Sequence, residues 1–332
     1  LAPGMQLPAV VGASAPYQNT ADMRTRGWEL SVNWRDQIGK VGYRVGFNLS
    51  DSQSKIVKYN SNESGILTSA LSNGSTFWNY YEGKDLGEIW GYEYDGFYTV
   101  DDFTDTSSWK LKEGVPSIDG YNPRPGDVKF KNLKDDDRGT NMISSGDNTV
   151  SNPGDRKVIG NNTPRYLYGI TLGANFKGFD LNVFMQGTGK RDAWIANNLK
   201  FPLYSDFKFI ALYKDLGNYW KPVDAANGDY TAANPNAEFP RIYGNYGNQG
   251  SNYRQSDKYL SDASYFRIKN VTLSYTFPKA WITKASLSQL KAFVSIENLA
   301  TFSSLPKGID PETLSWNYPA FRTVSFGLNV TL

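Results

Sequence analysis

The chain has 332 residues, of which 35 are Lys or Arg and 33 are Asp or Glu, so its formal net charge is only +2. This balance argues against a nucleic-acid-binding protein, because such proteins normally depend on clustered basic residues. The sequence contains neither Cys nor His. That composition excludes disulfides, thiolate nucleophiles, Ser-His-Asp catalysis and His-ligated zinc.

Seven segments show the alternation of apolar and polar residues that is typical of a strand with two different faces. In chain order they are residues 28–35, 41–50, 166–176, 179–187, 270–277, 290–298 and 323–332. Their length is roughly that of a tilted membrane-spanning β-strand, ~9–11 residues. One short helical turn is expected within residues 280–289. The sequence therefore predicts an all-β chain.

Short and long connections alternate between these segments. The short ones are residues 36–40, 177–178 and 279–289, and the long polar ones are residues 51–165, 188–264 and 299–321. Outer-membrane barrels show this pattern, with short periplasmic turns and long extracellular loops. Counting back from a periplasmic C-terminus places residues 1–27 outside. The mean hydropathy of −0.52 is compatible, because alternating strands are not hydrophobic on average.

The distribution of charged and aromatic residues supports a transmembrane antiparallel β-barrel. Arg35 and Arg44 fall on the polar side of their segments, whereas a lipid-facing Arg at mid-membrane would cost ~2–4 kcal/mol. Arg322 lies at a strand start, near the interface. Aromatic residues gather at strand ends, as in the girdles of a barrel: Trp28, Tyr166 and Tyr168 at the outer end, and Trp34, Tyr43, Phe176, Phe179, Tyr275 and Phe277 at the inner end.

Seven strands alone would leave two open edges, which lipid cannot satisfy. We therefore expect the barrel to be completed by strands from another part of the same polypeptide. The chain begins at Leu1, and a break in an exposed extracellular loop is the expected reason, since proteolytic nicking concentrates at loop tips. The alternative is a soluble β-sandwich in which the alternation separates core from solvent.

The ordered motifs of the chain resemble those of the C-terminal part of SusC/RagA-type TonB-dependent outer-membrane transporters. The stretch YEGKDLGEIWGYEYDGFY occupies residues 81–98, GDVKFKN residues 126–132, and DRKVIGNNTPRYLYGITLGANF residues 155–176. Further similar blocks cover nearly all the rest, at residues 19–30, 177–189, 260–278, 297–312 and 317–332.

The resemblance implies a location in the cell outer membrane and a role in nutrient uptake. The full family protein is a barrel of ~22 strands plugged by its own N-terminal domain. It imports glycans or oligopeptides together with a SusD-like surface lipoprotein, and the TonB complex supplies the energy. Residues 1–332 would form the C-terminal part of the barrel with its long extracellular loops. The plug, the TonB-contacting region and the remaining strands would lie outside these residues. The resemblance implies no enzymatic activity.

The family usually carries a DxNxDG-like acidic segment after its GD pair. Here the segment Asn132–Arg138 reads NLKDDDR, with Lys134 in place of an oxygen ligand, and an insertion follows at residues 139–151. A Ca²⁺ site near Asn132–Asp136 is therefore disfavoured, and no cofactor or metal is expected. The chain also ends on Leu332, where outer-membrane strands commonly end on an aromatic residue.

Three short patterns suggest chemistry but lack the partners that the chemistry needs. Residues 52–55 match S-x-x-K without a K-T-G partner. Residues 186–191, QGTGKR, fail the phosphate-loop pattern at two positions. Asp101, Asp102 and Asp105 lie in one loop run, whereas glycosidase carboxylates sit at separate strand ends. A secreted carbohydrate-binding β-sandwich and a carboxylate-dependent glycosidase are kept as alternative functions.

Aromatic residues of the long loops are the candidates for substrate or partner contacts. Flat rings with polar tips suit stacking on sugars, gripping peptides or docking a lid protein. The alternative is that they pack the loops against each other. The candidates are Trp78, Tyr81, Trp90, Tyr92, Trp194, Tyr219, Trp220, Tyr243 and Tyr246.

Overall fold

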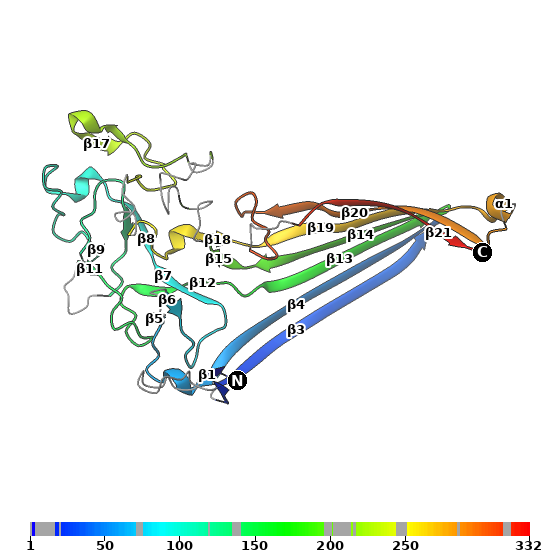
Figure 1. The fold of residues 1–332 in the computed structure, drawn as a ribbon, viewed down its shortest axis with the longest axis horizontal. Coiled ribbons are helices and arrows are strands. Elements are labelled where there is room, and N and C mark those ends of the chain that lie inside the picture. Colours follow the sequence, from blue (N-terminus) through cyan, green and yellow to red (C-terminus); the bar gives the residue numbers. More distant parts are fainter. Residues whose placement is uncertain are drawn as a thin grey trace. The chain divides into compact units, whose positions relative to one another are not determined.

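A seven-stranded antiparallel sheet dominates the computed structural model (Figure 1). The structure describes residues 2–3, 17–19, 21–70, 76–118, 120–134, 141–195, 201, 214, 217–243, 251–283, 286–314 and 320–332. The seven strands are β3 (Ala21–Ile38), β4 (Val41–Tyr59), β13 (Arg165–Phe176), β14 (Phe179–Lys190), β19 (Tyr265–Thr276), β20 (Gln289–Ser303) and β21 (Thr323–Thr331). Each pairs with its neighbours in chain order. All seven predicted strands are therefore confirmed, as an up-and-down meander.

The remaining strands of the described residues are short. Two of them precede β3, and the others lie in the long connections. In chain order the short strands are β1 (Ala2–Pro3), β2 (Tyr17–Gln18), β5 (Thr68–Ala70), β6 (Thr76–Trp78), β7 (Glu88–Tyr92), β8 (Tyr94–Phe97), β9 (Ser117–Ile118), β10 (Val128–Phe130), β11 (Met142–Ile143), β12 (Arg156–Asn161), β15 (Asp192–Trp194), β16 (Pro222–Asp224), β17 (Asp229–Ala232) and β18 (Leu260–Asp262). Among the described residues there is one α-helix, α1 (Lys279–Ile282), which is shorter than the segment 280–289 in which a helical turn is predicted. No helix of the described residues is long and apolar enough to span a membrane.

Several strands are longer than predicted. β3 has 18 residues and β4 has 19, so the predicted loop at 51–165 begins only after Tyr59. The additional residues of β4, 51–59, do not alternate in polarity. Backbone pairing between two long neighbours continues without alternation, because the ladder hydrogen bonds do not depend on side chains. The predicted turn at Lys177–Gly178 is confirmed, with φ of +47° and +90°, as type I′ hairpin turns require.

The register of the sheet separates an apolar face from a polar face. Paired residues across the strands form one aliphatic row: Val45, Leu172, Val183, Val271, Ile296 and Val324. The next row faces the opposite side and is polar or small: Arg44, Gly173, Asn182, Thr272, Ser295 and Ser325. Arg44 thus lies on the polar face, as its position in the sequence predicts.

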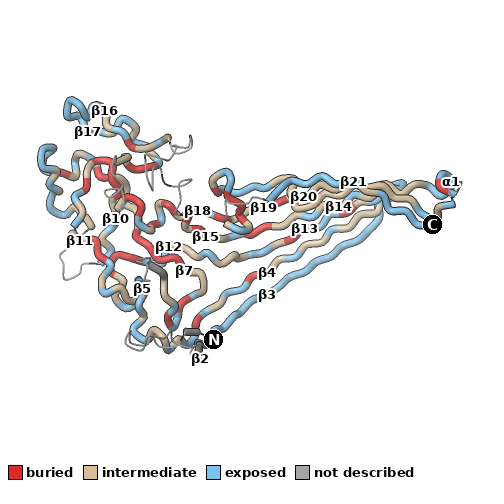
Figure 2. Tube along the Cα trace, in the orientation of Figure 1, coloured by how far each residue is buried: buried red, intermediate tan, exposed pale blue. Residues whose placement is uncertain are grey.

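Large apolar side chains on the apolar face are strongly exposed. Trp34 is 60% exposed and Phe326 is 81% exposed, and exposed residues run along the whole of β3 (Figure 2). A sandwich would bury this face against a second sheet, so the structure argues against that alternative. Within the described residues β3 and β21 each have one neighbour in the sheet. The two expected open edges are therefore present.

The chain divides into two compact units. The sheet unit comprises residues 25–53, 163–193 and 261–332, and the loop unit comprises residues 1–24, 54–162 and 194–260. Within the residues that the structure describes, the loop unit contains three aromatic-rich cores. Their buried members are Phe201, Phe239, Tyr253 and Tyr259 in the first, Tyr92, Val128, Phe130 and Ile143 in the second, and Leu67, Tyr81 and Trp90 in the third.

Candidate functional site

A segment that follows β20 is fixed to the polar face by buried ion pairs. We call residues 305–314 the strap. Arg267 on β19 donates from Nη2 to both carboxylate oxygens of Asp310 at 3.0 Å, and its Nη1 lies 3.0 Å from Glu312 Oε1. Lys269 Nζ lies 3.1 Å from both carboxylate oxygens of Glu312. Arg267 is only 2% exposed and Asp310 only 7%, so the strap is an integral part of the sheet unit.

The neighbouring strand β14 and the residue that follows it add further contacts to the strap. On β14, Gln186 Nε2 donates to Glu312 Oε1 at 2.7 Å, and just after β14, Arg191 Nη1 donates to the Pro311 carbonyl at 3.1 Å. Burial alone would raise the pKa of Asp310. Hydrogen bonds from the Glu312 amide and from Arg267 outweigh it and hold that pKa below its ordinary value. The strap carboxylate is therefore ionised at neutral pH.

In the loop unit, the pair Gly126–Asp127, which opens the GDVKFKN stretch, forms a buried junction between loop segments. Asp127 is fully buried and accepts hydrogen bonds from the Tyr121 hydroxyl at 2.9 Å, the Asn252 amide at 3.0 Å, the Arg124 backbone amide at 2.7 Å and the Tyr243 hydroxyl. One carboxylate thus joins its own turn, residues 121–127, to Tyr243 and Asn252, which lie more than 100 residues further along the chain. Burial raises the pKa of Asp127, although all four donors act in the opposite direction.

Gly126 is required beside this carboxylate. It has a φ of +88°, and a Cβ at this position would lie 2.3 Å from Cδ2 of Trp220. Both the left-handed backbone and the close ring exclude a side chain. The junction therefore explains the GD pair as a structural motif of the loops.

A second buried carboxylate closes the loop that contains the acidic segment. Asp155 accepts hydrogen bonds from the backbone amides of Leu133 at 2.6 Å, Lys134 at 3.1 Å and Ser144 at 2.8 Å. Asp135 and Asp136 lie outside the described residues, so a Ca²⁺ site near Asn132–Asp136 stays an untested prediction. Among the described residues no group of three or more acidic side chains could hold a metal ion.

The eight aromatic candidates for substrate or partner contacts that the structure describes do not gather on one surface. Tyr81, Trp90, Tyr92 and Trp220 are buried. Trp78, Trp194, Tyr219 and Tyr243 are partly buried, and Tyr246 lies outside the described residues. Trp90 donates from Nε1 to the Tyr81 hydroxyl at 3.1 Å inside one core, whereas Trp194 and Tyr219 pack against another. Their role as contacts stays a prediction.

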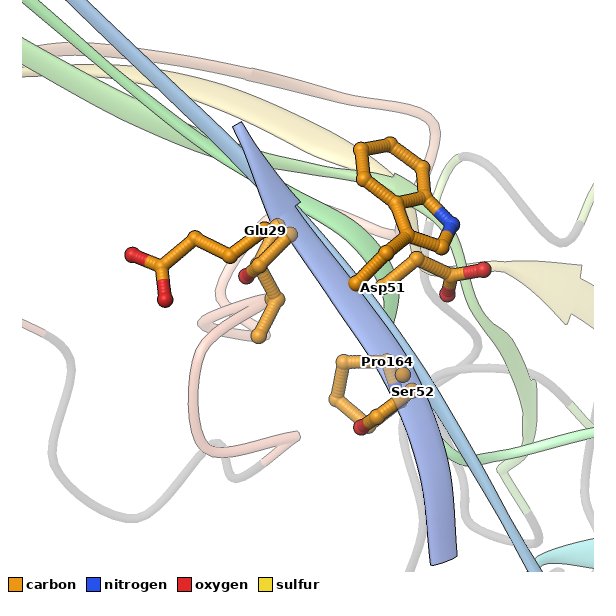
Figure 3. Close-up of a pocket in the computed structure, with 8 residues that line it drawn as sticks. Glu29, Asp51, Ser52 and Pro164 are labelled. Atoms are coloured by element: carbon orange, nitrogen blue, oxygen red, sulfur yellow. The ribbon is translucent and has the colours of Figure 1, made fainter. Parts of the chain in front are cut away.

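The hollow drawn in Figure 3 lies on β3, β4 and β13 and has a volume of about 330 Å³. Figure 3 shows the carboxylates of Glu29 and Asp51 pointing to opposite sides of β3. Asp51 is paired with Arg165. Ser52 also lines the hollow, but Lys55 stands three residues along the same strand and therefore faces the other side. The S-x-x-K pattern thus forms no nucleophile pair.

Comparisons with known proteins match the chain along nearly its whole length. It is 28% identical to TonB-dependent receptor P3 of Formosa agariphila, covering 98% of this chain and 30% of that protein. It is 23% identical to TonB-dependent receptor SusC of Bacteroides thetaiotaomicron, covering 94% of this chain and 27% of that protein. No protein-family model matches.

Solved structures give the same match at the level of the fold. The structure of the RagAB peptide transporter superposes with a TM-score of 0.64 at 19% identity, over 98% of this chain and 31% of that one. The RagAB importer in its open-open state gives a TM-score of 0.62 at 18% identity. The chain spans about a third of the length of the proteins it matches.

These matches confirm the predicted fold class, an all-β chain that carries strands of an outer-membrane barrel, and with it the predicted location. The relatives are named as receptors and transporters and not as enzymes. This agrees with the prediction of a protein without enzymatic activity.

Proposed function

Because the chain resembles SusC/RagA-type TonB-dependent transporters over nearly its whole length, we propose that it forms the C-terminal wall of a TonB-dependent nutrient importer. The observation that carries this proposal is the two-faced sheet. Its exposed aliphatic rows suit lipid, and its polar rows suit a water-filled lumen. The two open edges are where the remaining strands of the same polypeptide would pair.

The proposed mechanism is capture, enclosure and gated translocation, without covalent chemistry on the cargo. The loop unit would supply part of the capture surface and of the contact with a SusD-like surface lipoprotein. A plug formed by the N-terminal part of the polypeptide would fill the lumen and connect to TonB. The loop unit supports this role because its buried carboxylates and aromatic cores hold long connections in fixed positions, and rigid loops lose less entropy on binding.

The test is energy-dependent uptake by the full-length transporter in outer membranes. Cells that express it should accumulate a labelled oligopeptide or oligosaccharide digest, and a protonophore or loss of TonB should abolish the uptake. Detergent extraction should recover the chain with its plug-bearing N-terminal part and a surface lipoprotein. Recovery of a soluble protein without detergent, or uptake that is indifferent to the proton-motive force, would contradict the proposal.

A further inference from the structure

The hairpin end of the sheet unit, where the turns β3–β4 and β13–β14 and the connection through α1 lie, carries a continuous row of aromatic side chains. Phe176 pairs with Phe179, and Phe179 pairs with Tyr275, on the face that carries the aliphatic rows. The rings of Phe179 and Tyr275 are 4.6 Å apart, and the rings of Phe277 and Trp281 extend these contacts into α1. Phe176, Phe179 and Trp281 are exposed. We call residues 176–179 and 275–281 the hairpin rim.

Each of the three connections at this end contributes one exposed lysine, namely Lys40, Lys177 and Lys279. The ammonium group of Lys177 lies 5.2 Å from the centre of the Phe176 ring, so this turn lysine bends back over the apolar face. Among the described residues none of the three lysines forms an ion pair. The rim therefore presents uncompensated ammonium groups beside exposed rings.

The carboxylates at the hairpin end are engaged away from these lysines. Asp180 lies 3.9 Å from Arg44 and accepts a hydrogen bond from Asn182 on the polar face. Asp36 accepts the backbone amide of Gln37 at 2.7 Å. The rim itself reads FKGF and YTFPKAW and contains no acidic residue. Its formal charge is thus positive, on the side of the sheet that carries the aromatic rings.

The backbone at Lys177 is in a conformation that lysine rarely adopts. Its φ is +47°, and the first central position of a type I′ turn favours Asn, Asp or Gly because a longer side chain has an unfavourable contact with the backbone there. In the β3–β4 turn a glycine, Gly39, takes the positive φ of +61°. The turn geometry does not account for a lysine at position 177. Strain of this kind clusters at functional sites, so the side chain is the reason we infer for its presence.

We propose that the hairpin rim binds the headgroup of an anionic glycerophospholipid, with Lys177 as the principal contact to the phosphate and Lys40 and Lys279 on either side. Strands lie ~4.7–4.9 Å apart, so successive turns place an ammonium group roughly every 10 Å along the rim. The exposed rings lie against the first carbons of the acyl chains, as amphipathic residues do at a membrane interface. This inference needs the membrane location of the sheet but not the import of a nutrient.

The first test measures headgroup selectivity in the purified full-length transporter by native mass spectrometry. The protein is mixed with equal amounts of dioleoyl phosphatidylglycerol and dioleoyl phosphatidylcholine, which share their acyl chains and differ in net charge. The parent should retain more phosphatidylglycerol. Lys177→Asn should lower that retention about fivefold, the effect of one lysine near an anionic lipid surface, whereas Lys177→Arg should preserve it.

Two features of the variants separate lipid contact from folding and from charge. Asparagine suits the turn better than lysine, so Lys177→Asn should fold at least as completely as the parent, measured by heat-modifiable migration. Lys291→Asn is the matched control, because Lys291 lies near the same end but pairs with Asn329 on the polar face. It should change retention less than about twofold. Equal retention of the two lipids by the parent, or equal effects of the two asparagine variants, would overturn the proposal.

The second test identifies what covers the rim in intact cells. Ala280→Cys introduces the only thiol of this chain, at an exposed residue of α1, and it is labelled with a benzophenone maleimide in the full-length transporter. After irradiation, the adducts are identified by mass spectrometry, and glycerophospholipid adducts are expected. Adducts to a second protein would show that a protein partner covers the rim, and adducts to a saccharide-bearing lipid would assign a different headgroup. Either result would overturn the proposal.

Discussion

The carboxylate of Asp127 accepts a hydrogen bond from the hydroxyl of Tyr243, 116 residues further along the chain. Burial and the adjacent carboxylate raise the pKa of Tyr243, so its hydroxyl keeps its proton over the whole physiological range and remains a donor. The same carboxylate also binds Tyr121 and Asn252. One buried acidic residue thus connects the turn at residues 121–127 to the distant region that contains Tyr243 and Asn252.

Substituting this carboxylate should loosen the loops without unfolding the sheet. Asp127→Ala would leave buried donors without an acceptor, and each hydrogen bond to a charged group contributes ~1.5–3 kcal/mol. Amide hydrogen exchange of the purified full-length transporter should therefore accelerate around residues 121–128 and 241–243, while β13 and β14 stay protected. Asp95→Asn, at an exposed carboxylate, is the control. Unchanged protection in Asp127→Ala would show that the junction is not needed.

The adjacent glycine separates two physical effects. Gly126→Ala meets both an unfavourable φ of +88° and a Cβ contact of 2.3 Å with Trp220. Gly114→Ala meets a φ of +86° with no atom within 4 Å. A left-handed alanine alone costs ~1–2 kcal/mol, and forcing the ring aside adds ~1–3 kcal/mol. The loss of stability, measured by protease susceptibility of the loop unit, should therefore be larger for Gly126→Ala. Equal losses would show that Trp220 moves aside freely.

The sheet was predictable from the sequence because its pattern is local. The alternation of apolar and polar residues along Val41–Ser50 and Tyr166–Phe176 directly indicates the two faces of the sheet. Lys177–Gly178 indicates the hairpin turn. The end of β4 was not predictable. The strand continues to Tyr59 through backbone hydrogen bonds, which produce no alternation of apolar and polar side chains in the sequence.

The arrangement of the loops was not predictable, because it depends on contacts between residues far apart in the chain. Nothing local in Gly126–Asp127 indicates that Trp220 will cover the glycine or that Tyr243 will bind the carboxylate. Arg267 and Asp310 likewise meet through the strap. Counting aromatic residues in the loops found Tyr81 and Trp90 but could not show that both are buried. In the sequence, the GD pair was the one indication of this junction. An acidic residue that is buried must be surrounded by hydrogen-bond donors.

Acid should release the strap. The pKa of Asp310 is below its ordinary value in the folded protein, so its contribution to stability is complete above the unfolded pKa of about 3.9 and is lost as the pH falls through the folded pKa. Hydrogen exchange of residues 305–314, corrected for intrinsic rates, should therefore be slow at pH 7 and become faster below about pH 4. Asp310→Asn should remove most of this pH dependence. Protection of the strap that is the same at pH 7 and pH 3 would contradict the ion pair's role.

The two faces of β21 can be distinguished by introducing one positive charge at either of two adjacent residues. Phe326 lies on the apolar face and is 81% exposed, whereas Ser325 belongs to the polar row. An arginine at a lipid-facing position near mid-membrane costs ~2–4 kcal/mol, so Phe326→Arg should sharply lower the amount of folded full-length transporter in the outer membrane. Ser325→Arg should leave that amount nearly unchanged, because its charge would enter the lumen. The measurement is heat-modifiable migration of the extracted protein on gels, normalised to total expression. Equal loss in the two variants would mean that both faces of this strand meet the same surroundings, and the assignment of lipid and lumen sides would then be wrong.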